Sequence, residues 1–108
     1  MKGDRVGEFE ELTLLAVRAL GAQAYAVSVQ QFLEREARRA VSIGAVYAAL
    51  ERLEQKRFVR SALGDSTPER GGKRKRLFVV TPTGMQMLRD VRRVRDSIWE
   101  TLEKGSRS

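Results

Sequence analysis

Apolar residues recur at helical spacing along the first forty residues of the chain. This pattern predicts a first helix over residues 7–20, which Gly21 ends as a left-handed C-cap residue. A second helix is expected to begin at Ser28, because serine is a preferred N-cap residue, and to end near Ala40.

A third helix is predicted from its N-cap, Ser42, to about Lys56. Only Ala40 and Val41 separate it from the preceding helix, and two helices on so short a turn are typical of a helix-turn-helix. The exposed face near its start holds small residues around one aromatic, so that it can approach a groove closely, unless another helix presses on these small residues. This face consists of Ile43, Gly44, Ala45, Tyr47 and Ala48.

Two strands are predicted at residues 58–63 and 76–80, where β-branched and aromatic residues are frequent. A long polar tip joins them, and a hairpin that follows a helix-turn-helix is a wing. Thr81 and Pro82 then open a fourth helix that runs to about residue 104. We therefore expect a mainly α fold with a small β-hairpin wing, in which residues 1–81 form the winged helix-turn-helix and residues 82–108 a dimerisation helix.

The first and fourth helices carry more apolar surface than one small domain can cover. Two residues of the first helix lie outside its main stripe, and the fourth helix has a seam close to a heptad repeat. A homodimer would bury both apolar surfaces. The alternative is a fourth helix that lies across the first within one chain. The predicted dimer contacts are Leu14, Val17, Met87, Val91, Val94, Ile98 and Leu102.

Basic residues outnumber acidic ones by 21 to 14, which gives a net charge of +7. The excess is densest in residues 70–76, within the predicted wing, and such density attracts phosphate backbones. The chain has no cysteine and no histidine, which excludes disulfides, thiol chemistry, the usual zinc ligand sets and histidine-based catalysis. No spacing of acidic residues suggests a metal site, so we expect no catalytic residues, no metal and no cofactor.

No apolar run is long enough to span a membrane, and no secretory signal follows the N-terminus. These features predict a cytoplasmic, nucleoid-associated protein with an anionic partner.

Several segments of the chain resemble the motifs of one protein family. Residues 42–54, SIGAVYAALERLE, resemble the recognition-helix signature of PadR-type transcriptional regulators, and residues 55–59, QKRFV, resemble the segment that follows it. Residues 72–76, GKRKR, and 81–84, TPTG, are similar to the basic wing and to the opening of the last helix. The sequence departs from the family pattern at Arg57, where glycine is usual, and its single C-terminal helix resembles that of the short subfamily.

The resemblance implies a winged helix-turn-helix dimer that represses its own gene or an adjacent operon for a transporter or a detoxification enzyme. Its partner would be double-stranded DNA with a pseudo-palindromic operator, read by the third helix in the major groove and by the wing. The implied DNA-binding residues are Ser42, Gly44, Ala45, Tyr47, Ala48, Arg38, Arg39, Arg70, Lys73, Arg74 and Lys75.

Some short PadR-type proteins bind planar aromatic compounds beside a tryptophan of the paired fourth helices. Here Trp99 lies on that helix, one turn after Arg95, so a small aromatic effector could bind beside this pair, which is placed to stack as cation and ring. The competing interpretation makes Trp99 a packing residue of the dimer seam. Two other functions also fit a basic wing: binding of structured RNA, and a protein-interaction module without operator specificity.

Overall fold

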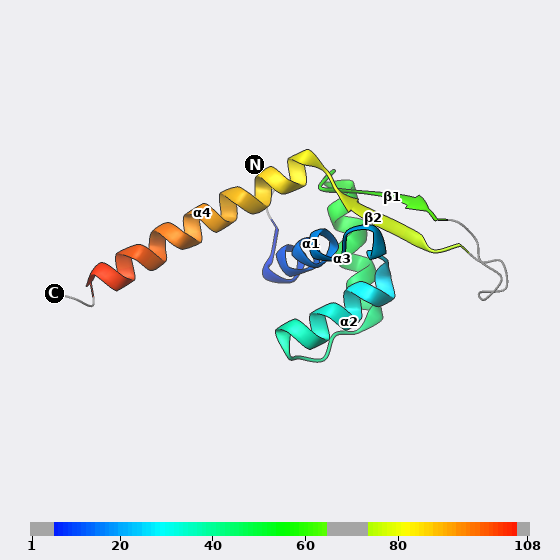
Figure 1. The fold of residues 1–108 in the computed structure, drawn as a ribbon, viewed down its shortest axis with the longest axis horizontal. Helices are drawn as coiled ribbons and strands as arrows, with labels where there is room; N and C mark the ends of the chain where they lie inside the picture. The colour runs from blue at the N-terminus through cyan, green and yellow to red at the C-terminus, as the bar shows by residue number, and fades with distance from the viewer. Residues whose placement is uncertain (1–5, 65–73, 106–108) are drawn as a thin grey trace.

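The computed structural model describes residues 6–64 and 74–105. Three helices form the body, a two-stranded hairpin lies beside them, and a long last helix extends away from the body (Figure 1). In chain order the elements are α1 (Glu8–Leu20), the short 3-10 turn η2 (Gly21–Gln23), α2 (Ala26–Ala37), α3 (Ile43–Gln55), β1 (Val59–Leu63), β2 (Arg76–Val80) and α4 (Pro82–Gly105).

The buried face of α1 differs from the predicted one. Leu14 and Val17 are only 0% and 1% exposed and belong to the core of the single chain, whereas Leu15 is 44% exposed. Neither residue is available to a second subunit, so their assignment to a dimer contact is wrong. Because α1 is apolar around much of its circumference, its packing against α2 and α3 decides which stripe is buried.

One apolar stripe from each of the other body helices completes the core. Each fully buried valine or leucine contributes about 1.5–3 kcal/mol to folding. These side chains are Val29 and Leu33 of α2, Val46, Leu50 and Leu53 of α3, and Val59 and Phe78 of the two strands.

The segment between α1 and α2 follows the predicted breaks only in part. Gly21 has a positive φ of 58°, as predicted, but its ψ of −124° lies outside the left-handed helical region. α2 begins at Ala26 with Tyr25 as its N-cap, three residues before the predicted N-cap, Ser28. Instead the Ser28 hydroxyl lies inside the first turn, where it accepts a hydrogen bond from the Tyr25 N–H (3.0 Å) and donates one to the Gln23 carbonyl (2.6 Å).

The connection between α2 and α3 is longer than the predicted turn. α2 ends at Ala37, and Arg38 follows in the left-handed conformation, so residues 38–42 join the two helices. Val41 in this loop is buried, and α2 binds both of its main-chain groups. Gln30 Nε2 donates to the Val41 carbonyl (2.8 Å), and Glu34 Oε2 accepts from its N–H (3.2 Å). Two polar side chains of α2 therefore position the start of α3.

The hairpin pairs β1 with β2 in antiparallel register, from Val59 opposite Val80 to Leu63 opposite Arg76. The Phe78 N–H donates to the carbonyl of Ala24 (2.9 Å), which ties β2 to the segment before α2. This confirms the mainly helical fold with a two-stranded hairpin. Residues 65–73, which include Arg70 and Lys73 of the predicted wing cluster, lie outside the described residues.

The turn after α3 anchors the start of α4. Arg57 keeps a positive φ of 64° although a side chain replaces the glycine expected there. Thr81 donates its hydroxyl to the Arg57 carbonyl (2.7 Å) and its N–H to the Phe58 carbonyl (2.9 Å). Gly84 packs so closely on Phe58 that a Cβ at this glycine would lie 2.3 Å from the Phe58 carbonyl oxygen. The first turn of α4 is therefore locked to the end of α3.

Beyond this anchor α4 leaves the body (Figure 1). Leu88 is buried, and Met85 and Met87 are partly buried against the core. Val91 is half-buried, and every residue from 92 to 105 is exposed. The exposed large apolar side chains of α4 are Val94, Ile98, Trp99 and Leu102, which are 57–63% exposed.

No helix among the described residues is long and apolar enough to cross a membrane. Within residues 6–64 and 74–105, no group of three or more acidic side chains is placed to hold a metal ion.

Candidate nucleic-acid interface

The start of α3 is capped and open. Ser42 is its N-cap, as predicted, and its hydroxyl accepts a hydrogen bond from the Ala45 N–H (3.1 Å). Gly44 and Ala45 are exposed, and a Cβ built on Gly44 would meet nothing within 4 Å. This open space excludes the alternative that another helix packs against Gly44 and requires a small residue there. The face can approach another surface closely, and the N-terminus of the helix favours an anionic group there.

Tyr47 lies one turn further along α3 and is 48% exposed, while Ala48 beside it is half-buried. The Tyr47 ring lines a groove of about 530 Å³ between α3, the start of α2 and the base of the hairpin. Its other lining residues are Tyr25, Ala26, Val27, Arg74, Lys75, Arg76 and Phe78. The structure thus brings together the predicted Tyr47, Arg74 and Lys75.

The cations at the base of the hairpin differ in how firmly they are held. Lys75 Nζ lies 3.4 Å from the ring centroid of Tyr25, a cation–π contact that fixes the ammonium beside the groove. Arg76 is engaged on its other side by Glu54, at 2.5 Å, and by the Ser61 hydroxyl, at 3.0 Å. The ammonium group of Lys75 therefore lies at the groove, whereas the guanidinium group of Arg76 is bound by Glu54 and Ser61.

Among the groove residues not predicted from the sequence are Tyr25 and Val27. Tyr25 is the N-cap of α2, and Val27 is its second residue and 43% exposed. Their role depends on pairing across about fifty residues with Lys75 and its neighbours. The only local signal for them is a valine two residues after a tyrosine, at the start of a helix.

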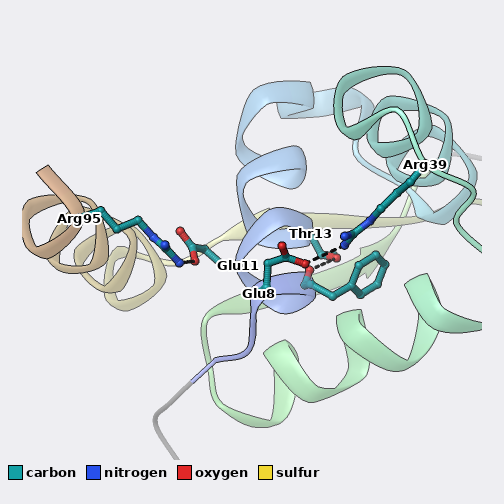
Figure 2. A network of polar contacts seen from close by, with 6 residues as sticks. Glu8, Glu11, Thr13, Arg39 and Arg95 are labelled. Atoms are coloured by element: carbon teal, nitrogen blue, oxygen red, sulfur yellow. Dashed lines mark hydrogen bonds and ion pairs between the residues drawn. The ribbon is translucent and has the colours of Figure 1, made fainter. Parts of the chain in front are cut away.

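The two arginines before α3 lie in different settings. Arg38 is exposed and adopts the left-handed conformation. Arg39 Nη2 donates to Glu8 Oε1 of α1 at 2.9 Å (Figure 2), and both side chains are substantially exposed. Such an exposed pair is weak, so a phosphate can replace the carboxylate as the partner of Arg39.

Glu10 holds the far end of α3 against α1. Its side chain is only 13% exposed, and its carboxylate accepts hydrogen bonds from Lys56 Nζ (2.8 Å) and from Arg52 Nε (3.0 Å). Burial raises the pKa of Glu10, but the hydrogen bonds from Lys56 and Arg52 and their positive charges outweigh it, so that the pKa lies below its ordinary value of 4.5. Three charged side chains therefore fix the position of the predicted recognition helix.

The predicted effector residues line a second groove, of about 610 Å³, between α1 and α4. Trp99 is 63% exposed there, and Leu15 and Leu88 supply apolar wall. Arg95 is engaged by α1: its Nη2 donates to Glu11 Oε1 at 2.8 Å (Figure 2). This hydrogen bond and the charge of Glu11 raise the pKa of the Arg95 guanidinium.

Comparison with known proteins agrees with this geometry. Residues 14–90 match the model of the transcriptional regulator PadR-like family. A PadR-like transcription factor from Bacteroides fragilis is 25% identical with a TM-score of 0.74, over 89% of this chain and 87% of that one. A PadR-like transcriptional regulator from Bacillus cereus is 18% identical with a TM-score of 0.69, over 89% and 88% of the two chains.

A PadR family transcriptional regulator from Eggerthella lenta has the same fold, with 19% identity and a TM-score of 0.67 over 90% of this chain and 84% of that one. A search of the curated proteins found no match. Regulators of the matched family bind DNA and are not enzymes. The family match covers more than half of the sequence, so the chain belongs to the PadR-like family of transcriptional regulators.

Proposed function

We propose that this protein is a dimeric repressor that binds a pseudo-palindromic operator in its own promoter or in that of an adjacent transporter or detoxification operon. The observation that carries the proposal is the joint exposure of the α3 start and of the cationic groove beside it. Gly44 offers open space, and Tyr47, Arg74 and Lys75 meet at one groove. α3 would enter the major groove, with the hairpin along the backbone or the minor groove.

The exposed side chains at the start of α3 limit how this protein reads DNA. Ser42, Gly44 and Ala45 lack the paired hydrogen-bonding groups that read bases: the two donors with which arginine reads guanine, or the donor and acceptor with which asparagine reads adenine. Tyr47 offers one hydroxyl, suited to a phosphate. Most of the sequence preference should therefore come from the shape and deformability of the operator.

The proposed dimer rests on α4. Val94, Ile98 and Leu102 follow one another at spacings of four residues and are each more than half exposed. They form an apolar stripe along α4 that a second α4 would cover. A two-fold dimer of this kind prefers a symmetric DNA site whose half-sites lie about one helical turn apart.

The groove between α1 and α4 is the place we propose for a small aromatic effector. Leu15, Leu88 and Trp99 provide apolar wall, and Arg18 and Arg92 lie at its rim. Because Trp99 is the only tryptophan, its fluorescence reports this site without interference. A titration with planar aromatic acids and cations tests the effector: quenching that saturates supports it, and an unchanged spectrum with every compound removes it.

The central experiment titrates the protein against the DNA upstream of its own gene, at several salt concentrations, beside a scrambled duplex and a structured RNA. We expect saturable binding to the upstream duplex alone, with a salt slope steeper than a single hairpin can give. Lys75→Gln and Tyr47→Phe should weaken binding. Arg93→Gln, which removes one charge from an exposed residue of α4, is the matched control and should bind with a salt slope like that of the wild type.

Each alternative result has its own meaning. Equal weak binding to both duplexes contradicts an operator in this promoter, and preference for the RNA favours an RNA-binding winged helix. Sedimentation at several concentrations tests the dimer, with Ile98→Glu expected to give monomers. Transcription in vitro from the bound promoter tests repression, since an activator would increase the transcript.

A further inference from the structure

α1 carries three carboxylates in its first turn, and each meets a cation from a different part of the molecule. Glu8 meets Arg39 of the α2–α3 loop. Glu10 meets the two cations at the far end of α3, and Glu11 meets Arg95 of α4 at 2.8 Å. Figure 2 shows Glu8 and Glu11 on one turn of α1, reaching toward opposite sides. This turn therefore joins the DNA-binding elements to α4.

The direction of α4 relative to α3 depends on attachment at its start and on one contact further along. Its first turns are held by the close approach of Gly84 to Phe58, just after α3, by the hydrogen bonds of Thr81 and by the buried Leu88. The contact further along is that of Arg95, which lies eleven residues after Gly84, or about 16 Å along the helix at 1.5 Å per residue. A helix held at one end can pivot, and a second contact at this distance fixes its angle.

Other arginines of α4 do not make this connection. Arg92 pairs with Asp96 at 3.6 Å, and Arg93 pairs with Asp90 at 3.1 Å, so both ion pairs stay within α4. Arg95 instead reaches Glu11 of α1, whose side chain is only 16% exposed. Residues 96–105, beyond Arg95, are all exposed. The Glu11–Arg95 pair thus bridges two elements where neighbouring pairs of the same chemistry do not.

We infer that the Glu11–Arg95 ion pair is a positioning contact that sets the angle between α4 and α3, and thereby the half-site spacing that the dimer selects. The inference rests on the proposed function, because two copies joined through α4 transmit this angle to the distance between their recognition helices. A change at Arg95 should therefore alter the choice among operator spacings. The affinity of one α3 for one half-site should stay the same, since neither residue lines the groove beside Tyr47.

The absence of cysteine permits a direct measurement of this distance. A nitroxide on Glu51→Cys, an exposed position of α3, places one label on each protomer of a dimer without DNA. Pulsed electron–electron double resonance then gives the distribution of distances between the two α3 helices. We expect one narrow distribution for the otherwise native chain, a broader or shifted one for Arg95→Gln and Glu11→Gln, and recovery in the double variant Glu11→Arg with Arg95→Glu.

The functional readout is binding to a set of duplexes that share the same half-sites and differ only in their spacing. The wild type should prefer one spacing, and Arg95→Gln should reduce that preference by about two- to fivefold, the range that an exposed ion pair can exert. Arg93→Gln should leave both readouts unchanged, and circular dichroism checks that each variant keeps its helices. The charge-swapped pair should restore the preference, which a general loss of stability would not do.

The outcomes separate the two proposals. If the labelled, otherwise native protein gives no measurable distance between two nitroxides, the dimer is refuted and this inference with it. A dimeric wild type with a spacing preference that Arg95→Gln leaves intact refutes the inference alone. The same holds if Arg93→Gln has an effect as large as that of Arg95→Gln.

Discussion

Gly84 gives the sharpest test of the anchor between α3 and α4. In Gly84→Ala the new methyl carbon would lie 2.3 Å from the carbonyl oxygen of Phe58 and 2.9 Å from Cγ1 of Val80. A carbon atom normally stays about 3.3 Å or more from such an oxygen. The Phe58 carbonyl or the first turn of α4 must therefore move by about 1 Å, and that carbonyl already accepts a hydrogen bond from Thr81.

The expected cost follows from this displacement. Inserting a methyl group into a packed site costs about 1–3 kcal/mol, and alanine in place of glycine returns at most about 1 kcal/mol through helix propensity. We expect a net loss of about 1–2 kcal/mol in the free energy of unfolding. In a domain of this size each kcal/mol lowers the Tm by roughly 4–8 °C.

The assay is urea unfolding followed by circular dichroism, with protein concentration held constant because a dimer's stability depends on it. Gly44→Ala is the matched control, since its new methyl group meets nothing within 4 Å. This control should be as stable as the wild type or more stable by up to about 1 kcal/mol. It should nevertheless bind DNA more weakly, because the methyl group enlarges the exposed face of α3. Wild-type stability in Gly84→Ala would refute the proposed anchor.

Three further predictions concern the body of the protein. Arg57→Gly should raise the free energy of unfolding by about 0.5–1 kcal/mol, because the positive φ strains an arginine but not a glycine; a decrease in chemical denaturation would contradict this. Leu14→Ala should cost about 2–5 kcal/mol at every protein concentration, and Leu15→Ala much less; an equal, concentration-dependent loss in both would return Leu14 to a subunit contact. The pKa of Glu10 is lowered in the folded state. Its contribution to the free energy of unfolding is therefore fully present above about pH 4.5 and disappears as the pH falls through the pKa of the folded state. Glu10→Gln should remove this part of the pH dependence, as unfolding curves between pH 6 and about pH 3 would show, and an unchanged slope would exclude its role.

Much of the fold follows from interactions between residues that are close together in the sequence. Ser42 caps α3 because a serine hydroxyl reaches the N–H three residues ahead without help from the rest of the chain. The strands and the start of α4 at Pro82 also depend on neighbours in the sequence, and they lie within a residue of their predicted positions.

Tertiary contacts decided what the local pattern left open. α1 is apolar on several sides, so only its packing against α2 and α3 could select Leu14 over Leu15 for the core. Arg57 keeps a glycine-like conformation because its carbonyl accepts a hydrogen bond from Thr81, twenty-four residues later in the chain.

The same division applies to the candidate site. The start of α3 and the basic hairpin could be found in the sequence, since a helix cap and a cluster of charges are local features. Tyr25 beneath Lys75 and Glu11 beside Arg95 could not, because fifty and eighty-four residues separate the partners and the sequence does not state which surfaces meet. Helix caps, strand-forming runs and charge clusters are local, so the residues themselves specify them. Which charged side chains pair with one another, as Arg95 does with Glu11 and Arg76 with Glu54, depends on long-range packing.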